Sequence, residues 1–205
     1  MGTSLKIQAL LFDLGGVIID IEFERVWQSW ARDAACPVES IRRSIGQDET
    51  YLRYECGEIS LADYFVYLRG AMSVSLTDEQ LLTGWNEIFV GEMPGIATVL
   101  RDLEPRIPLY AFSNTNRAHE EVWSVRFADV LKPFQKVFVS STIGLRKPDR
   151  ASFGHVVAEV GVPASSILFF DDTMENVVGP RAAGMHAAHT RSAADIVAAL
   201  GRYGF

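Results

Sequence analysis

The sequence contains little of several features that would define its class at once. Only two of its 205 residues are cysteines, and Cys36 and Cys56 are not spaced as a metal-binding or redox motif. So few cysteines in a chain of this length are typical of reduced thiols in a reducing compartment. The sequence also has no run of about 18 apolar residues, the length that a membrane-spanning helix requires. A membrane anchor of that kind is therefore not expected.

Positive charge is scarce as well. The 19 lysines and arginines are outnumbered by 26 aspartates and glutamates, which gives a formal net charge of -7. Binding to nucleic acid or to an anionic membrane depends on a surplus of positive charge, so neither partner is expected. The N-terminus lacks the basic segment, long apolar stretch and cleavage site of a secretory signal. These features together predict a cytoplasmic protein.

Short apolar runs do alternate with segments of helical period. The runs of strand length are 7–12, 107–112, 136–140, 167–170 and a weaker 185–189. Between them, Phe153, Val156, Val157 and Val160 keep the spacing of one helix face, and Gly161 follows as a helix stop. This alternation is typical of parallel sheets with crossover helices. The predicted fold class is therefore α/β, with a Rossmann-like parallel sheet.

The first two runs are separated by about ninety residues, far more than one crossover connection needs. Within this interval, segments 23–34, 38–44, 61–68 and 78–89 carry apolar residues at helical spacing. Ser60 and Thr77 provide helix start signals, each with an acid or amide three residues later. We therefore predict a helical cap over residues 18–90, inserted into an α/β core formed by residues 1–17 and 91–205.

Acidic motifs follow two of the predicted strands. Asp13 comes after the first run and is followed by Gly15 and Gly16, which let the backbone approach a ligand closely. A carboxylate at that position can attack phosphorus and divide one hydrolysis into two steps, although a lone Asp after a strand is more often a cap or turn residue. Asp171 and Asp172 follow another run, where like charges raise each other's pKa unless a cation compensates. Mg²⁺, which prefers hard oxygen ligands, is the predicted cation. The alternative is a capping pair for the helix that begins near Met174.

Two further motifs supply neutral and positive groups. Ser113 and Asn114 end the second run, where a helix is expected to begin and where a hydroxyl, backbone amides and the helix dipole could face a phosphoryl oxygen. Lys147 precedes Pro148, which can occupy a first helical turn and hold the residue before it extended. Alone, these residues are typical of an N-cap and a solvated charge. Because ligands bind beyond the carboxyl ends of parallel strands, we expect all the motifs to meet at one rim.

Taken together, the stretches 12–15, 113–117, 144–148 and 169–172 resemble, in this order, the motifs of the haloacid dehalogenase (HAD) superfamily of hydrolases. The resemblance covers nearly the whole chain and includes a helical cap after the first strand. Within the superfamily, these stretches are similar to those of bacterial phosphatases that act on glucose 1-phosphate, which are related to the phosphatase half of epoxide hydrolases. The resemblance implies Mg²⁺-dependent hydrolysis of a small phosphorylated metabolite.

The same resemblance assigns roles to individual residues. Asp13 is implied to be the nucleophile, which forms an aspartyl phosphate, and Lys147 to orient it and to neutralise the transferred group. The implied metal ligands are Asp13, the carbonyl of Gly15, Asp172 as the primary carboxylate and Asp171 as the supporting one. The implied phosphate-binding residues are Ser113, Asn114 and Lys147.

One departure from the family pattern concerns Gly15. Most phosphatases of the superfamily have a second Asp at that position, which acts as general acid and then as base. Such catalysis contributes roughly 10² to 10⁴ in rate, so its loss favours a substrate with a good leaving group, such as a sugar 1-phosphate. Asp20, a substrate hydroxyl or a chain of waters are the candidates for activating water in the second step.

Two other functions remain open at this stage. A carbon–halogen hydrolase uses the same Asp nucleophile without a second Asp and without a metal, but it gains nothing from the Asp171–Asp172 pair. A catalytically weak sugar-phosphate-binding protein is the alternative outside the enzymes. The sequence does not indicate the oligomeric state.

Substrate specificity is expected to lie in the cap, because the core motifs contact only phosphate and metal. The cap candidates are Arg25, Trp27, Trp30, Arg42, Arg43, Tyr51, Arg53 and Tyr54, most of which also fit ordinary buried or solvated helix faces. Asn116, Arg117 and His119 are further candidates. His155, His186 and His189 are expected to be structural or exposed. Closure of the cap over the substrate is expected to exclude water, with hinges near 16–21 and 90–95.

Overall fold

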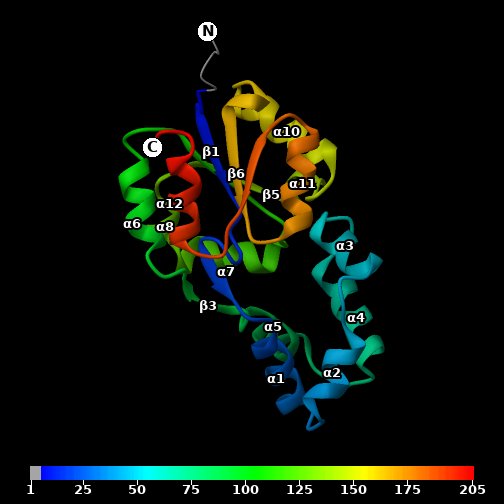
Figure 1. Ribbon diagram of the computed structural model, residues 1–205. Helices are drawn as coiled ribbons and strands as arrows, with labels where there is room; N and C mark the ends of the chain where they lie inside the picture. The colour runs from blue at the N-terminus through cyan, green and yellow to red at the C-terminus, as the bar shows by residue number, and fades with distance from the viewer. Residues whose placement is uncertain (1–5) are drawn as a thin grey trace.

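Five parallel strands form the central sheet, in the order β5-β4-β1-β6-β7 (Figure 1). Their bounds are β1 (Ala9–Phe12), β4 (Leu109–Ser113), β5 (Phe134–Val139), β6 (Ile167–Asp171) and β7 (His186–His189). The computed structural model describes residues 6–205, so residues 1–5 of the predicted core lie outside it. The α/β class with a Rossmann-like parallel sheet is confirmed. From β1 the strand order runs outward in opposite directions, to β4 and β5 on one side and to β6 and β7 on the other. Ligands bind at such a switch point in parallel sheets.

Both faces of the sheet are covered, which explains the continuous apolar runs in the sequence. In β1, Leu10 and Phe12 contribute to one buried cluster, while Ala9 and Leu11 contribute to a second. On the first face lie α6 (Ile96–Leu103) and α12 (Ala193–Gly201), whose apolar residues join the first cluster. On the other face lie α10 (Arg150–Val160) and α11 (Met174–Ala182), as Figure 1 shows. Gly161 ends α10 with a φ of +76°, as predicted.

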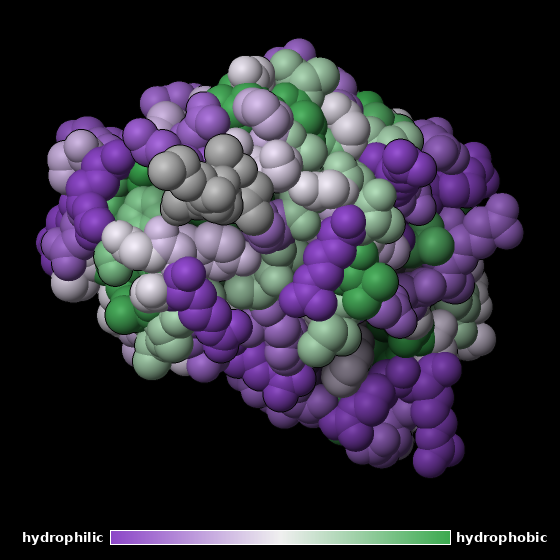
Figure 2. All heavy atoms as spheres, turned by 45° about the horizontal axis from the view of Figure 1, so that its top comes forward, coloured by the Kyte–Doolittle hydropathy of each residue, from purple (hydrophilic) through white to green (hydrophobic). Residues whose placement is uncertain are grey.

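The remaining elements of the core are short connections around the sheet. These are α7 (Arg117–Arg126), α8 (Ala128–Leu131), α9 (Ser140–Ile143) and the 3₁₀ turn at Ala164–Ser166. On the face shown in Figure 2, hydrophobic residues form small groups among hydrophilic ones. Within residues 6–205, no helix combines the length and the hydropathy that crossing a membrane would take.

Helices between the first two core strands gather beyond one end of the sheet (Figure 1). They are α1 (Phe23–Asp33), α2 (Val38–Ser44), α3 (Glu49–Glu55), α4 (Leu61–Met72) and α5 (Asp78–Asn86). The start signals predicted at Ser60 and Thr77 are confirmed, since both residues form capping boxes with the residue three positions later. The boundaries of the cap at residues 18 and 90 stay a prediction.

An antiparallel ribbon of β2 (Ile19–Ile21) and β3 (Phe89–Glu92) leads into and out of these helices. Neither this ribbon nor α3 was predicted from the sequence. The last cap helix was also predicted to extend to residue 89, whereas α5 ends at Asn86 because Phe89 pairs with Ile21 in the ribbon.

Three local expectations about the core were wrong. No helix begins directly after Ser113 and Asn114, because Asn116 is the N-cap and α7 starts at Arg117. Pro148 lies before α10 rather than in its first turn, which begins at Arg150. The strand predicted at 136–140 spans Phe134–Val139 instead, and Ser140 starts α9.

Candidate active site

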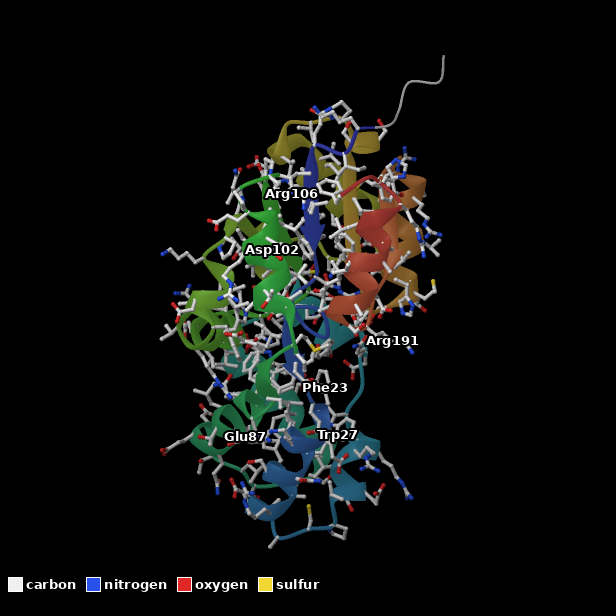
Figure 3. All side chains as sticks on the ribbon, turned by 60° about the vertical axis from the view of Figure 1, so that its left-hand side comes forward. Phe23, Trp27, Glu87, Asp102, Arg106 and Arg191 are labelled. Carbon is white, nitrogen blue, oxygen red and sulfur yellow. The ribbon has the colours of Figure 1, made fainter. Side chains whose placement is uncertain are left out.

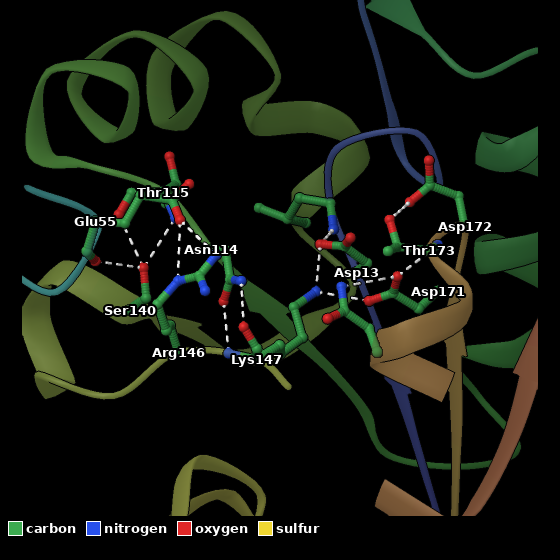
Figure 4. A network of polar contacts seen from close by, with 12 residues as sticks. Asp13, Glu55, Asn114, Thr115, Ser140, Arg146, Lys147, Asp171, Asp172 and Thr173 are labelled. Atoms are coloured by element: carbon green, nitrogen blue, oxygen red, sulfur yellow. Dashed lines mark hydrogen bonds and ion pairs between the residues drawn. The ribbon is translucent and has the colours of Figure 1, made fainter. Parts of the chain in front are cut away.

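A buried lysine lies between two carboxylates at the rim of the sheet (Figure 4). The Lys147 Nζ atom is 2.8 Å from Oδ1 of Asp13 and 2.8 Å from Oδ2 of Asp171. Burial alone would lower the pKa of Lys147, but the two carboxylates raise it above its ordinary value. The rings of Phe112 and Phe169 face the ammonium at 5.5 and 5.4 Å. The ammonium therefore holds Asp13 in place and stays charged.

Three carboxylates converge at the same point. Asp13, Asp171 and Asp172 each offer an oxygen, and these oxygens all lie within 4.8 Å of one another. Burial, together with the charges of Asp171 and Asp172, raises the pKa of Asp13 to about 8, although Lys147 opposes these effects. Burial and the neighbouring Asp171 likewise raise the pKa of Asp172. One ammonium does not balance three acids, so the cluster favours an additional cation.

The two adjacent acids have different surroundings. Asp171 is fully buried and accepts hydrogen bonds from the Thr173 backbone N–H (2.8 Å), from Asn176 Nδ2 (3.1 Å) and from Lys147. These bonds tie Asp171 to the start of α11, but the N-cap of that helix is Thr173 and no side-chain capping bond forms there. Asp172 is only partly buried and lines the cavity above the sheet. Of the pair, Asp172 therefore has the carboxylate that can reach a ligand.

A tight turn places Asp172 close to the segment after Asp13. Gly16 has a φ of +76°, and a Cβ atom there would lie 2.4 Å from Oδ2 of Asp172. The backbone N–H of Leu14 donates to Oδ1 of Asp13 at 2.6 Å, and the Leu14 carbonyl accepts from Val17, Ile18 and Ile19. Glycine at position 16 is therefore required both by the backbone conformation and by the close approach.

Asn114 holds the backbone of Lys147 on both sides. Its Nδ2 donates to the Lys147 carbonyl at 2.9 Å, and its Oδ1 accepts from the Lys147 N–H at 2.8 Å. The amide of Asn114 thus fixes the segment that carries the ammonium. A direct contact between Asn114 and phosphate stays a prediction. Ser113 at the end of β4 is buried and lines the cavity.

A cavity of about 440 Å³ opens above these residues. Six of the seven residues predicted for the site line it, namely Asp13, Gly15, Ser113, Asn114, Lys147 and Asp172, while Asp171 lies beneath. Helix α3 contributes Tyr51 and Glu55 to the opposite wall. The carboxylate of Glu55 is buried and pairs with Arg146 at 3.0 Å. Glu55 was not predicted from the sequence, because a single acid on an unpredicted helix forms no recognisable motif.

Most residues considered for specificity lie elsewhere. Three of the arginines in the cap form exposed ion pairs, Arg25 with Glu87, Arg42 with Glu24 and Glu39, and Arg53 with Glu58. Tyr51 is the cap candidate that lines this cavity. Asp20, considered for activating water, pairs with Gly91 in the ribbon and is not among the lining residues.

Residues 7–184 match the family of haloacid dehalogenase-like hydrolases, a span that covers most of the 205 residues. The chain belongs to that family. It is therefore a HAD-like hydrolase, in agreement with the motifs and with the sheet order.

Curated relatives are about a quarter identical to this hydrolase over the aligned residues. The drimenol cyclase drtB of Aspergillus calidoustus is 26% identical over 88% of the chain, but the chain spans only 33% of that protein's length. The sesquiterpene phosphatase astK of Aspergillus oryzae is 26% identical, over 92% of the chain and 91% of that protein. The D-ribitol-5-phosphate phosphatase of Bacteroides thetaiotaomicron is 24% identical, over 92% and 94%.

The fold is shared with solved structures. The HAD family enzyme bt-2542 from Bacteroides thetaiotaomicron, solved in complex with magnesium and inorganic phosphate, superposes with a TM-score of 0.78. It is 24% identical, and the match covers 91% of this chain and 96% of that one. At this identity the likeness shows the fold.

Proposed function

We propose that this hydrolase is a Mg²⁺-dependent phosphatase that cleaves a small phosphomonoester through an aspartyl phosphate on Asp13. The observation that carries the proposal is the position of Asp13, which is held by Lys147 at 2.8 Å within a cluster of three carboxylates at the rim of the sheet. Relatives named as phosphatases that match along nearly their full lengths support the same reaction.

The donor set fits a magnesium ion. Hard carboxylate oxygens within 4.8 Å of one another are the ligands that Mg²⁺ prefers. Burial first, and the neighbouring carboxylates second, raise the pKa values of Asp13 and Asp172, so a bound cation would favour their charged forms. Asp13, Asp172 and the carbonyl of Gly15 would hold the ion, with Asp171 fixed behind them. When bound, the ion offsets the charge of the phosphoryl oxygens and of the attacking carboxylate.

In the first step, a carboxylate oxygen of Asp13 attacks phosphorus, and an O–P bond forms as the bond to the substrate alcohol breaks. Lys147 keeps Asp13 oriented and compensates charge on the phosphoryl group, and the Ser113 hydroxyl is available to donate to a phosphoryl oxygen. In the second step, water takes the phosphoryl group from Asp13, which returns inorganic phosphate and the free carboxylate.

No side chain has been identified that would donate a proton to the departing oxygen of the substrate. Gly15 occupies the position of the usual general acid, so the departing oxygen takes its proton from water or leaves as a stable anion. The anomeric oxygen of a sugar 1-phosphate is such a leaving group, and the proposal of a sugar phosphate such as glucose 1-phosphate rests on this argument. The relatives are named for D-ribitol 5-phosphate and for sesquiterpenes, which include both polar and apolar alcohols.

Release of inorganic phosphate from a panel of esters, with Mg²⁺ and with a chelator, tests the proposal. We expect turnover that requires Mg²⁺ and disappears in Asp13→Asn, while Asp195→Asn, at a residue that does not line the cavity, retains it. Halide release from 2-haloacids that persists in chelator would establish the dehalogenase alternative instead. Phosphate-ester binding without any turnover would establish the binding-protein alternative.

A further inference from the structure

A second, smaller cavity of about 170 Å³ adjoins the catalytic one. The two cavities share Phe23, Gln47 and Tyr51 as lining residues. The rest of the smaller cavity is lined by Trp27, Trp30, Ile45, Gly46, Tyr64 and Trp85. Phe23 and Trp27 project from the same side of α1, one turn apart, with Phe23 nearer the core (Figure 3). A group attached to a phosphate at Asp13 therefore meets this cavity on the cap side.

The walls of the cavity are held in place before any ligand binds. The ring N–H of Trp30 donates to the Leu81 carbonyl at 3.0 Å, and the Trp30 ring stacks on Trp85 with centroids 5.7 Å apart. A Cβ atom at Gly84 would lie 2.3 Å from the Trp30 ring, so glycine is what allows this packing. The cavity is thus preformed rather than opened by displacement of its walls.

Hydrogen-bonding groups are scarce on these walls. The Trp30 N–H is already used, and the Tyr51 hydroxyl lies beside Glu55, which together with burial raises the pKa of Tyr51 well above its ordinary value. The Tyr64 hydroxyl and the Trp85 N–H have no hydrogen-bond partner among the described residues, but both are buried, so a ligand could reach them only if the walls moved. Gln47 is exposed at the mouth. A hydroxylated ring would lose its hydrogen bonds to water here, whereas a hydrocarbon group would gain from burial.

We infer that the smaller cavity binds the alcohol part of the substrate, and that this alcohol carries a compact apolar group of about the size of a six-membered carbon ring. Apolar cavities of about 150 Å³ are known to hold benzene, which sets the size. This inference rests on the proposed phosphatase function. It opposes the glucose 1-phosphate hypothesis, because a sugar would place hydroxyls against the aromatic walls.

Two esters that differ only in hydroxylation and the ring oxygen provide the test. Cyclohexylmethyl phosphate and glucose 6-phosphate both release a primary alcohol from a six-membered ring, and ethyl phosphate is the reference without a ring. We expect kcat/KM for cyclohexylmethyl phosphate to exceed that for either other ester by at least about tenfold, mainly through a lower KM. Equal rates, or a preference for glucose 6-phosphate or glucose 1-phosphate, would overturn the inference while leaving the phosphatase proposal intact. If no ester releases phosphate, both proposals fail.

Substitutions of residues that line the smaller cavity test whether the preference for cyclohexylmethyl phosphate depends on that cavity. Ile45→Trp fills the cavity, so the ratio of kcat/KM between cyclohexylmethyl and ethyl phosphates should fall toward one. Val66→Trp places the same ring on an exposed position of α4 and should leave the ratio unchanged. Trp27→Ala enlarges the cavity and should shift the preference toward larger apolar esters, which keeps the test valid if Ile45→Trp does not fold. Ratios that stay constant in a folded wall variant would overturn the inference.

Discussion

The buried carboxylate of Glu55 accepts two hydrogen bonds from Arg146, from Nη2 at 3.0 Å and from Nε at 3.2 Å (Figure 4). Arg146 immediately precedes Lys147, so this ion pair joins α3 to the segment that carries the central ammonium. The Glu55 carbonyl also accepts a hydrogen bond from the Ser140 hydroxyl at 2.7 Å. The last residue of α3 is therefore fastened to the core through both its side chain and its backbone.

Removing one partner of this pair should destabilise the protein more than removing both. Arg146→Met leaves the Glu55 carboxylate buried without a cation, which typically costs about 3–5 kcal/mol in the free energy of unfolding. Glu55→Gln combined with Arg146→Met removes that charge, so the double variant should be more stable than Arg146→Met alone. Denaturant titration at pH 7 measures both. Arg53→Met breaks an exposed pair on the same helix and should cost about 1 kcal/mol or less.

The turn after Asp13 gives a second prediction. Gly16→Ala forces a side chain into a positive φ and toward Asp172, where a Cβ atom would be 2.4 Å from the carboxylate. We expect phosphatase activity to fall by about 100-fold or more, because misplacing a catalytic group by about 1 Å has an effect of this size. Gly161→Ala is the matched control, since Gly161 at the end of α10 has the same φ of +76° but open space around it. That variant should lose about 1 kcal/mol of stability and keep its activity.

Metal binding should be visible without turnover. Mg²⁺ that binds only the folded protein stabilises it by about 2.7 kcal/mol at 100 times its dissociation constant, so the melting temperature should rise with Mg²⁺ concentration. Asp172→Asn removes the accessible carboxylate of the cluster and should abolish the rise. Asp195→Asn alters a capping residue of α12 and should leave the rise unchanged, although the starting melting temperature falls. An equal rise in both variants would exclude the cluster as the binding site.

Most of the site could be predicted because of the parallel topology. Asp13, Ser113 and Asp171 each follow or end a strand, and parallel neighbours bring such positions to a common rim whatever their separation in sequence. The pattern of the helices was also clear where caps were strong, as at Ser60 and Thr77. Each of these patterns is local in the sequence, and the parallel sheet brings the residues at the strand ends together in one site.

The parts that could not be predicted depend on contacts between distant segments. Helix α3 has seven residues, and its buried side chains contact distant segments, Tyr51 and Tyr54 those of α4 and α5 and Glu55 the core. The Asn114 side chain forms two hydrogen bonds with the Lys147 backbone, and these bonds exist only because two loops 33 residues apart in sequence meet. The ribbon that displaces Phe89 from a helix likewise pairs residues far apart in sequence. Periodicity carries no information about such pairs.

A buried histidine should make stability depend on pH. Burial lowers the pKa of His119 to about 4, partly opposed by its contact with the Trp85 carbonyl. The unfolded chain binds a proton below about pH 6.5, whereas the folded protein does so only below about pH 4. The contribution of neutral His119 is therefore complete above pH 6.5 and is lost as the pH falls toward 4. Between pH 7.5 and 5 the loss amounts to about 2 kcal/mol.

Comparing variants isolates this contribution from the carboxylates that titrate in the same range. His119→Gln keeps a donor that can reach the Trp85 carbonyl but cannot bind a proton, so its free energy of unfolding should fall less than that of the wild type between pH 7.5 and 5. His155→Gln, on a partly exposed position of α10, should follow the wild type. If the free energies of unfolding of His119→Gln and the wild type change in parallel, His119 does not titrate with a lowered pKa. The acidic cluster cannot hide the difference, because its raised pKa values make acidification stabilising to the same extent in both proteins.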